Sequence, residues 1–96
     1  MEKFAFISRH QPTPSQIELA SKMGIELVPV GDRDGFNISP DEFVEGDFRG
    51  VVVVHAMAAM RCLKKGLAVG IFNNVNRAPE GAKPTFETTE LVIERL

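Results

Sequence analysis

The chain has 96 residues, 44% of them hydrophobic and 25% charged, which is ordinary for one globular domain spanning residues 1–96. A net charge of -2 and a pI near 5.6 argue against binding to duplex nucleic acid, which usually needs a basic face. The single Cys62 excludes an internal disulfide, and no segment has the pattern of a secretory signal, so we expect a cytoplasmic protein. No apolar run is long enough to span a membrane.

The first quarter of the chain predicts a strand, a helix and a second strand. Residues 3–7 contain an unbroken apolar run over 4–7, which is typical of a strand covered on both faces. Thr13-Pro14-Ser15-Gln16 fits a capping box with proline at the first helical position, and it predicts a helix that ends near Gly24. Residues 25–30 predict the second strand.

A loop and a short helix are expected next. Asp32 and Asp34 stand at two positions of a calcium-binding loop, but Asn37 occupies the position where that loop needs glycine. We therefore expect no calcium site. Ser39-Pro40-Asp41-Glu42 predicts a second capping box and a short helix that carries Phe43 inward.

Residues 50–54 are glycine followed by four valines and predict a buried, central strand that ends at His55. Residues 56–65 then predict a helix, and Gly66 is expected to terminate it. The apolar face expected for this helix consists of Ala56, Ala59, Met60 and Leu63.

The last third predicts a buried strand over residues 67–72, a polar and turn-rich loop over 73–81, and a terminal strand over 86–96. A helical stripe also fits the terminal segment. The order of elements predicts an α/β fold, a small Rossmann-like open sheet of about five mostly parallel strands with helices on both faces.

Polar residues follow three of the predicted strands at the edge where such sheets bind ligands, beyond the carboxyl ends of the strands. No glycine-rich dinucleotide or phosphate loop follows the first strand, and His10, His55 and Cys62 have no metal-ligand spacing, so we expect neither cofactor nor metal. The candidate catalytic residues are His10 and His55, and the candidate ligand-binding residues are Ser8, Arg9, Thr13, Asn73, Asn74, Asn76 and Arg77.

These residue types suit a phosphate ester. Arginine offers a planar fork to phosphate, amides at the helix start after Thr13 favour an anion, and histidine can act as acid, base or nucleophile. Each also has a structural alternative, because histidine can bond a loop carbonyl and asparagine can support a turn. Arg9-His10 resembles part of the arginine-histidine-glycine motif of histidine phosphatases, but Gln11 replaces the glycine and the chain is too short for that fold.

The short strand ending in Ser8-Arg9-His10, followed by a proline and a helix, resembles the amino terminus of small CRISPR-associated proteins of type III systems. These are Rossmann-like relatives of the CARF domain that include ring nucleases. The Thr13-Pro14 helix start and the strand, helix and strand pattern of residues 50–72 are similar to related families.

This resemblance implies a homodimer whose strand-end edges form one pocket for a cyclic oligoadenylate, as part of antiviral defence. It implies metal-independent cleavage in which Arg9 and the amides near Thr13 hold phosphate and His10 or His55 assists proton transfer. Asn73, Asn74 and Asn76 would contact base or ribose, and Arg77 would be a second phosphate ligand. The alternative is a non-catalytic module that binds a nucleotide, another phosphate-bearing small ligand or a protein.

Overall fold

The computed structural model of the chain describes residues 1–31, 39–54 and 56–96. Its helices and strands follow the predicted order, and their bounds are β1 Glu2–Ile7, α1 Pro14–Lys22, β2 Ile25–Gly31, α2 Pro40–Glu45, β3 Gly50–Val52, α3 Ala56–Lys64, β4 Ala68–Asn76 and β5 Phe86–Glu94. The Asp32, Asp34, Asn37 and His55 predictions lie outside the described residues. No helix in the described ranges is long and apolar enough to cross a membrane.

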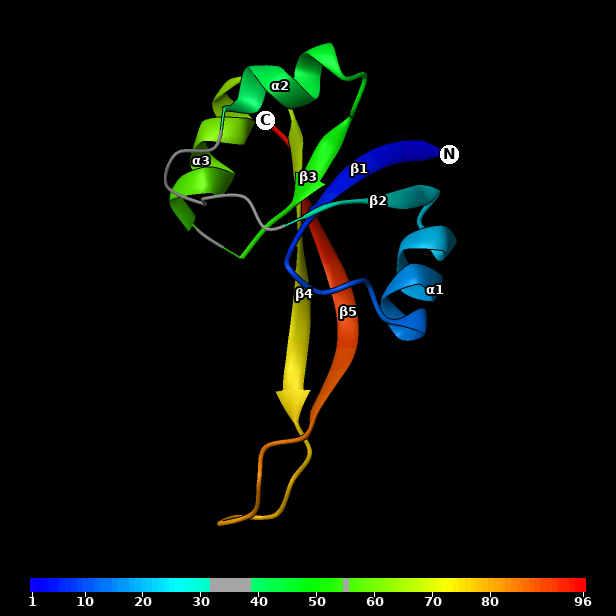
Figure 1. Cartoon of the computed structure of the whole chain (residues 1–96), viewed down its shortest axis with the longest axis vertical. Coiled ribbons are helices and arrows are strands. Elements are labelled where there is room, and N and C mark those ends of the chain that lie inside the picture. The colour runs from blue at the N-terminus through cyan, green and yellow to red at the C-terminus, as the bar shows by residue number, and fades with distance from the viewer. Residues whose placement is uncertain (32–38, 55) are drawn as a thin grey trace.

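The five strands form one sheet in the order β2-β1-β3-β4-β5. The first four strands are parallel, and β5 runs antiparallel to β4. Helix α1 lies on one side of the sheet, and α2 and α3 lie on the other (Figure 1). The prediction of a Rossmann-like α/β open sheet with mostly parallel strands is therefore confirmed. Strand β2 lies on one side of β1 in the sheet, and β3 and β4 lie on the other side. The strand order therefore reverses between β1 and β3.

Alternation along the strands divides the apolar residues between two cores. Phe4 and Phe6 pack with Ala20 of α1 on one face, and Ala5 packs with Phe43 and the α3 residues on the other. A strand covered on both faces needs such a continuous apolar run, which explains why residues 3–7 were predictable.

Gly50 allows β1, β3 and β4 to pack closely. A Cβ atom at this position would lie 2.5 Å from the Ala68 carbonyl oxygen and 2.6 Å from the Phe4 ring. Only glycine fits without movement of the backbone or of a buried ring.

The predicted cap of α1 is confirmed, whereas that of α2 is half correct. The Thr13 side chain accepts a hydrogen bond from the Gln16 amide, and the Gln16 side chain accepts one from the Thr13 amide. Helix α2 begins where expected and buries Phe43, whose ring meets Phe48 edge to face. However, the Ser39 side chain makes no cap hydrogen bond to the described residues, so the second capping box was wrong.

The apolar face predicted for α3 was also wrong in part. Ala58, Ala59 and Cys62 are buried, whereas Met60 is 54% exposed. Small side chains let the helix approach the sheet closely, and the long methionine side chain then reaches the surface. Strand β3 stops at Val52, two residues earlier than predicted.

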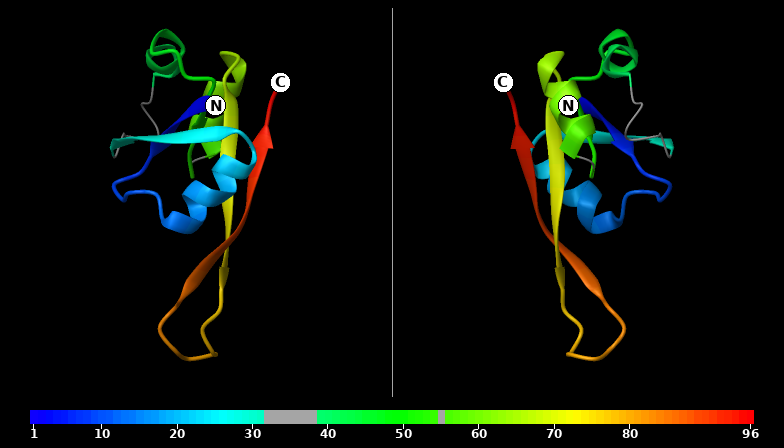
Figure 2. Two further views of the ribbon diagram at one scale, coloured as in Figure 1. Left: turned by 90° about the vertical axis from the view of Figure 1, so that its right-hand side faces the viewer. Right: turned by 90° about the vertical axis from the view of Figure 1, so that its left-hand side faces the viewer.

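The largest departure from prediction is the segment expected to be a loop after residue 72. Strand β4 continues to Asn76 because β5, confirmed as a strand, pairs with it over its whole outer half. Pairing with β3 ends at Gly70, and the outer part of the hairpin, residues 73–90, projects from the body of the molecule (Figures 1 and 2). We call these residues the arm.

Candidate ligand-binding cleft

A cleft of about 490 Å³ opens at the carboxyl ends of β1 and β3. This is the point where the strand order reverses, and the two crossover connections diverge there to leave a crevice. Its volume falls within the range of about 300–1,000 Å³ that small-molecule sites occupy. The polar lining residues are Ser8, Arg9, His10, Gln11, Thr13, Gln16 and Asn74, and the apolar ones are Phe6, Ile7, Val52, Val53, Val54 and Phe72.

The cleft brings together five of the nine candidate residues, namely Ser8, Arg9, His10, Thr13 and Asn74. Asn73, Asn76 and Arg77 are not among the residues that line it, and His55 lies outside the described residues. Sequence reasoning missed Gln11 and Gln16. Gln16 could have been predicted, because it lies in the first turn of the helix that follows β1. Such a residue faces the same edge of the sheet as the residue that caps the helix, Thr13.

The loop after β1 leaves two side chains free for a ligand. The Ser8 side chain accepts a hydrogen bond from the His10 amide at 3.0 Å, which holds the loop in a tight turn. The side chains of Arg9 and His10 are exposed and make no hydrogen bond or ion pair with the described part of the chain. The guanidinium and the imidazole can therefore bind a ligand without first breaking a contact to the described residues.

The amino-terminal end of α1 offers fewer backbone donors than the sequence suggests. Pro14 has no N–H group, and the Gln16 amide is used by the Thr13 hydroxyl at 3.2 Å. The Ile17 amide donates to the Thr13 carbonyl at 3.0 Å. The Gln16 side-chain oxygen accepts the Thr13 amide at 3.0 Å, and the NH₂ group of the same side chain, which makes no hydrogen bond to the described residues, can donate into the cleft.

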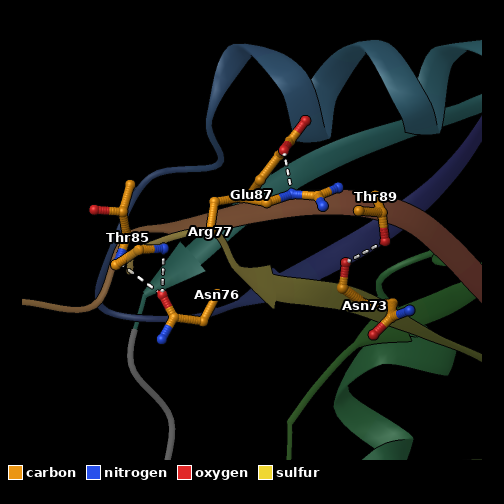
Figure 3. A network of polar contacts seen from close by, with 7 residues as sticks. Asn73, Asn76, Arg77, Thr85, Glu87 and Thr89 are labelled. Carbon is orange, nitrogen blue, oxygen red and sulfur yellow. Dashed lines mark hydrogen bonds and ion pairs between the residues drawn. The ribbon is translucent and has the colours of Figure 1, made fainter. Parts of the chain in front are cut away.

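The predicted site residues on the arm bond to other residues of the arm (Figure 3). The side-chain NH₂ group of Asn73 donates to the Glu90 carboxylate at 3.2 Å, and the Arg77 Nε donates to the Glu87 carboxylate at 2.8 Å. The Asn76 side-chain oxygen accepts from the amides of Ala78 and Thr85, at 3.0 and 3.1 Å. These contacts hold the hairpin together and leave the three side chains away from the cleft.

Asn74 differs from its neighbours on the arm. Its side-chain oxygen accepts a hydrogen bond from the Thr88 hydroxyl, with 2.6 Å between the oxygens, and the residue also lines the cleft. The NH₂ group of the same amide makes no hydrogen bond to the described residues and can donate to a ligand.

The described lining of the cleft is opposite in charge to the whole chain. The chain contains 13 acidic residues, but none of the described ones lines the cleft, and Arg9 is the only permanently charged residue among the described lining residues. The apolar lining includes Phe6 and Phe72, whose rings meet edge to face at 6.4 Å between centroids. The cleft is therefore suited to an anion that also carries a flat apolar group.

Cys62 is not among the residues that line this cleft. Cys62 is fully buried on the core-facing side of α3, and burial raises the pKa of its thiol, which is typical of a packing residue. No group of three or more potential metal ligands occurs in the ranges that the structure describes.

Fold and cleft together define the class of the protein: a Rossmann-like α/β domain with a cleft at the carboxyl ends of its parallel strands. No family model, no curated protein and no solved structure matches the chain.

Proposed function

We propose that the cleft binds a nucleotide phosphate ester, and that the ligand is a cyclic oligoadenylate that the protein cleaves. The observation that carries the proposal is the lining of the cleft. A guanidinium that has no partner among the described residues and several amide and hydroxyl groups surround an apolar floor with aromatic rings, and no described carboxylate is present to repel phosphate. This combination matches the two parts of a nucleotide.

Each part of the ligand has a partner in the cleft. The Arg9 guanidinium binds a phosphate through two parallel hydrogen bonds, and the free NH₂ groups of Gln16 and Asn74 bond ribose or base. The adenine packs on the apolar wall that contains Phe72. An acidic protein can bind such a ligand because a few focused donors suffice for a small anion.

In the proposed reaction, the ligand supplies its own nucleophile. The ribose 2′-oxygen attacks the adjacent phosphorus in line, the P–O5′ bond breaks, and the products are a 2′,3′-cyclic phosphate and a free 5′-hydroxyl. One proton leaves the 2′-hydroxyl and one is added to the departing 5′-oxygen. The protein must align the ester, stabilise the charge on the phosphoryl oxygens and transfer protons. His10, which lines the cleft, is the proposed proton carrier, with His55 as the second.

Incubation with cyclic tetra- and hexa-adenylate in the presence of EDTA tests the proposal, with chromatography to separate ring from linear product and calorimetry to measure binding. We expect linear product at micromolar protein. If the protein neither binds nor cleaves these rings, the assigned ligand is refuted. Binding without cleavage would refute the enzyme and favour the alternative, a non-catalytic nucleotide-binding module.

The histidines separate binding from chemistry. His10→Ala and His55→Ala should bind the ring as the wild type does, while turnover falls about 100-fold or more, because general acid–base catalysis contributes roughly that factor. Lys83→Ala, an exposed change near the tip of the arm and outside the cleft, is the control. Unchanged turnover in both histidine variants would remove these residues from the reaction.

A further inference from the structure

Phe86 is an exposed aromatic residue, whereas the other described phenylalanines are packed. Those others are buried or partly buried, namely Phe4, Phe6, Phe43, Phe48 and Phe72. Phe86 begins β5 near the tip of the arm, and 67% of it is exposed. Its ring makes no aromatic contact with the described residues. A single exposed apolar side chain is common on protein surfaces, so its surroundings must decide whether it has a role.

Strand pairing places Phe86 on the same face of the hairpin as a residue that lines the cleft. Phe86 is opposite Asn76 in the register of β4 and β5. Asn74, which lines the cleft, lies two residues before Asn76 and therefore shares its face. Phe86 is thus a diagonal neighbour of Asn74 across the two strands. Diagonal side chains lie about 7–8 Å apart, within reach of an aromatic ring, so Phe86 extends the cleft-side surface outward along the arm.

The acidic residues of β5 lie on the opposite face of the hairpin. Glu94 is opposite Val69, which belongs to the core on the α3 side of the sheet. Glu90 and Glu87 are also opposite odd-numbered residues of β4, which share a face with Val69. The face that carries Phe86 therefore has no glutamate of β5. A ligand with several phosphates can lie along this face without meeting one of these carboxylates.

We propose that Phe86 is a platform for a second base, which makes the protein prefer ligands with two or more bases to mononucleotides. This inference rests on the proposed function, in which one base packs on the cleft wall that contains Phe72. Phe86 is level with Asn76, about 13 Å along β4 from Phe72, so no single base reaches both rings. A second base of the same ligand can stack on the exposed ring. The free NH₂ group of Asn74, between the two rings, can donate to the phosphate or ribose that joins the bases.

The affinities of each variant for a ring and for a mononucleotide test the inference. The ring is cyclic tetra-adenylate built from 2′-deoxyriboses, which lacks the attacking hydroxyl and stays intact, and the mononucleotide is 2′-deoxyadenosine monophosphate. Phe86→Ala should weaken binding of the ring about tenfold, because stacking of one base on an aromatic side chain accounts for roughly 5- to 150-fold. Its affinity for the mononucleotide, which occupies the cleft alone, should change less than about twofold. Calorimetry measures the ring, and an NMR titration measures the mononucleotide.

Two further variants separate stacking from a general effect of the substitution. Phe86→Tyr keeps an aromatic ring in place and should bind both ligands as the wild type does. Val92→Ala removes an exposed apolar side chain from the other face of β5 and should change neither affinity. The platform is overturned if Phe86→Ala binds the ring normally, loses both ligands equally, or loses no more than Val92→Ala or Phe86→Tyr.

The wild type distinguishes failure of the platform from failure of the proposed function. If it binds the mononucleotide and not the ring, the platform is overturned, while nucleotide binding by the cleft stands. If it binds neither ligand, the proposed function is refuted together with the platform.

Discussion

The cleft and the arm contain similar polar residues and use them in opposite ways. In the cleft, the Arg9 side chain has no partner in the described chain, and the amide groups of Gln16 and Asn74 each keep donors free. On the arm, Arg77 is paired with Glu87, and the Asn76 oxygen accepts two backbone amides. The type of residue is therefore a poor guide to function. What matters is whether the folded chain has already satisfied its hydrogen bonds.

The core of the sheet and the arm differ in packing, and paired substitutions measure the difference. Phe4 is fully buried in the sheet, whereas Phe86 on the arm is 67% exposed. Phe4→Ala should lower the free energy of unfolding by about 3–5 kcal/mol because it leaves a cavity in the core. Phe86→Ala should change it by less than about 0.5 kcal/mol. Urea denaturation of both variants at low protein concentration makes the comparison. Equal losses would show that the arm belongs to the cooperative core.

The affinity for cyclic tetra-adenylate should distinguish Arg9 in the cleft from Arg77 on the arm. Arg9→Ala should weaken the binding of cyclic tetra-adenylate about 10- to 100-fold, because it removes hydrogen bonds between charged groups. Arg77→Ala should change the affinity less than about twofold, since Arg77 is held by Glu87 on the arm. Calorimetry gives both values, and Arg9→Lys keeps the charge without the planar fork and should fall between them. Equal losses in the two alanine variants would place the ligand on the arm.

The fold was predictable because most elements depend on local patterns. The apolar residues at 4–7 and 50–52 favour strands buried on both faces, and the capping box at Thr13 starts α1 where expected. The errors occur where distant contacts decide the outcome. Strand β4 extends through three asparagines because β5 pairs with them, and nothing within residues 73–76 indicates that partner.

The site was predictable to the extent that it follows from topology. Residues directly after β1 reach the strand-end edge in any parallel sheet, so Ser8, Arg9 and His10 were placed correctly in the cleft. Asn76 and Arg77 were expected there because they seemed to follow β4, but the strand carries them away along the arm. Strand length, which is set by pairing and not by composition, decided which candidates line the cleft.

The smallest effect predicted concerns the stability of the arm itself. Asn76 closes the hairpin by accepting the amides of Ala78 and Thr85, so Asn76→Ala should speed hydrogen exchange of those two amides about fivefold, the equivalent of roughly 1 kcal/mol. The midpoint of global unfolding should stay unchanged, because the arm opens locally without disturbing the core. Asn76→Asp keeps an acceptor oxygen in the same place and is the matched control. If the Asp variant exchanges as fast as the Ala variant, these hydrogen bonds do not hold the arm, and Asn76 regains its place among the candidates for ligand binding.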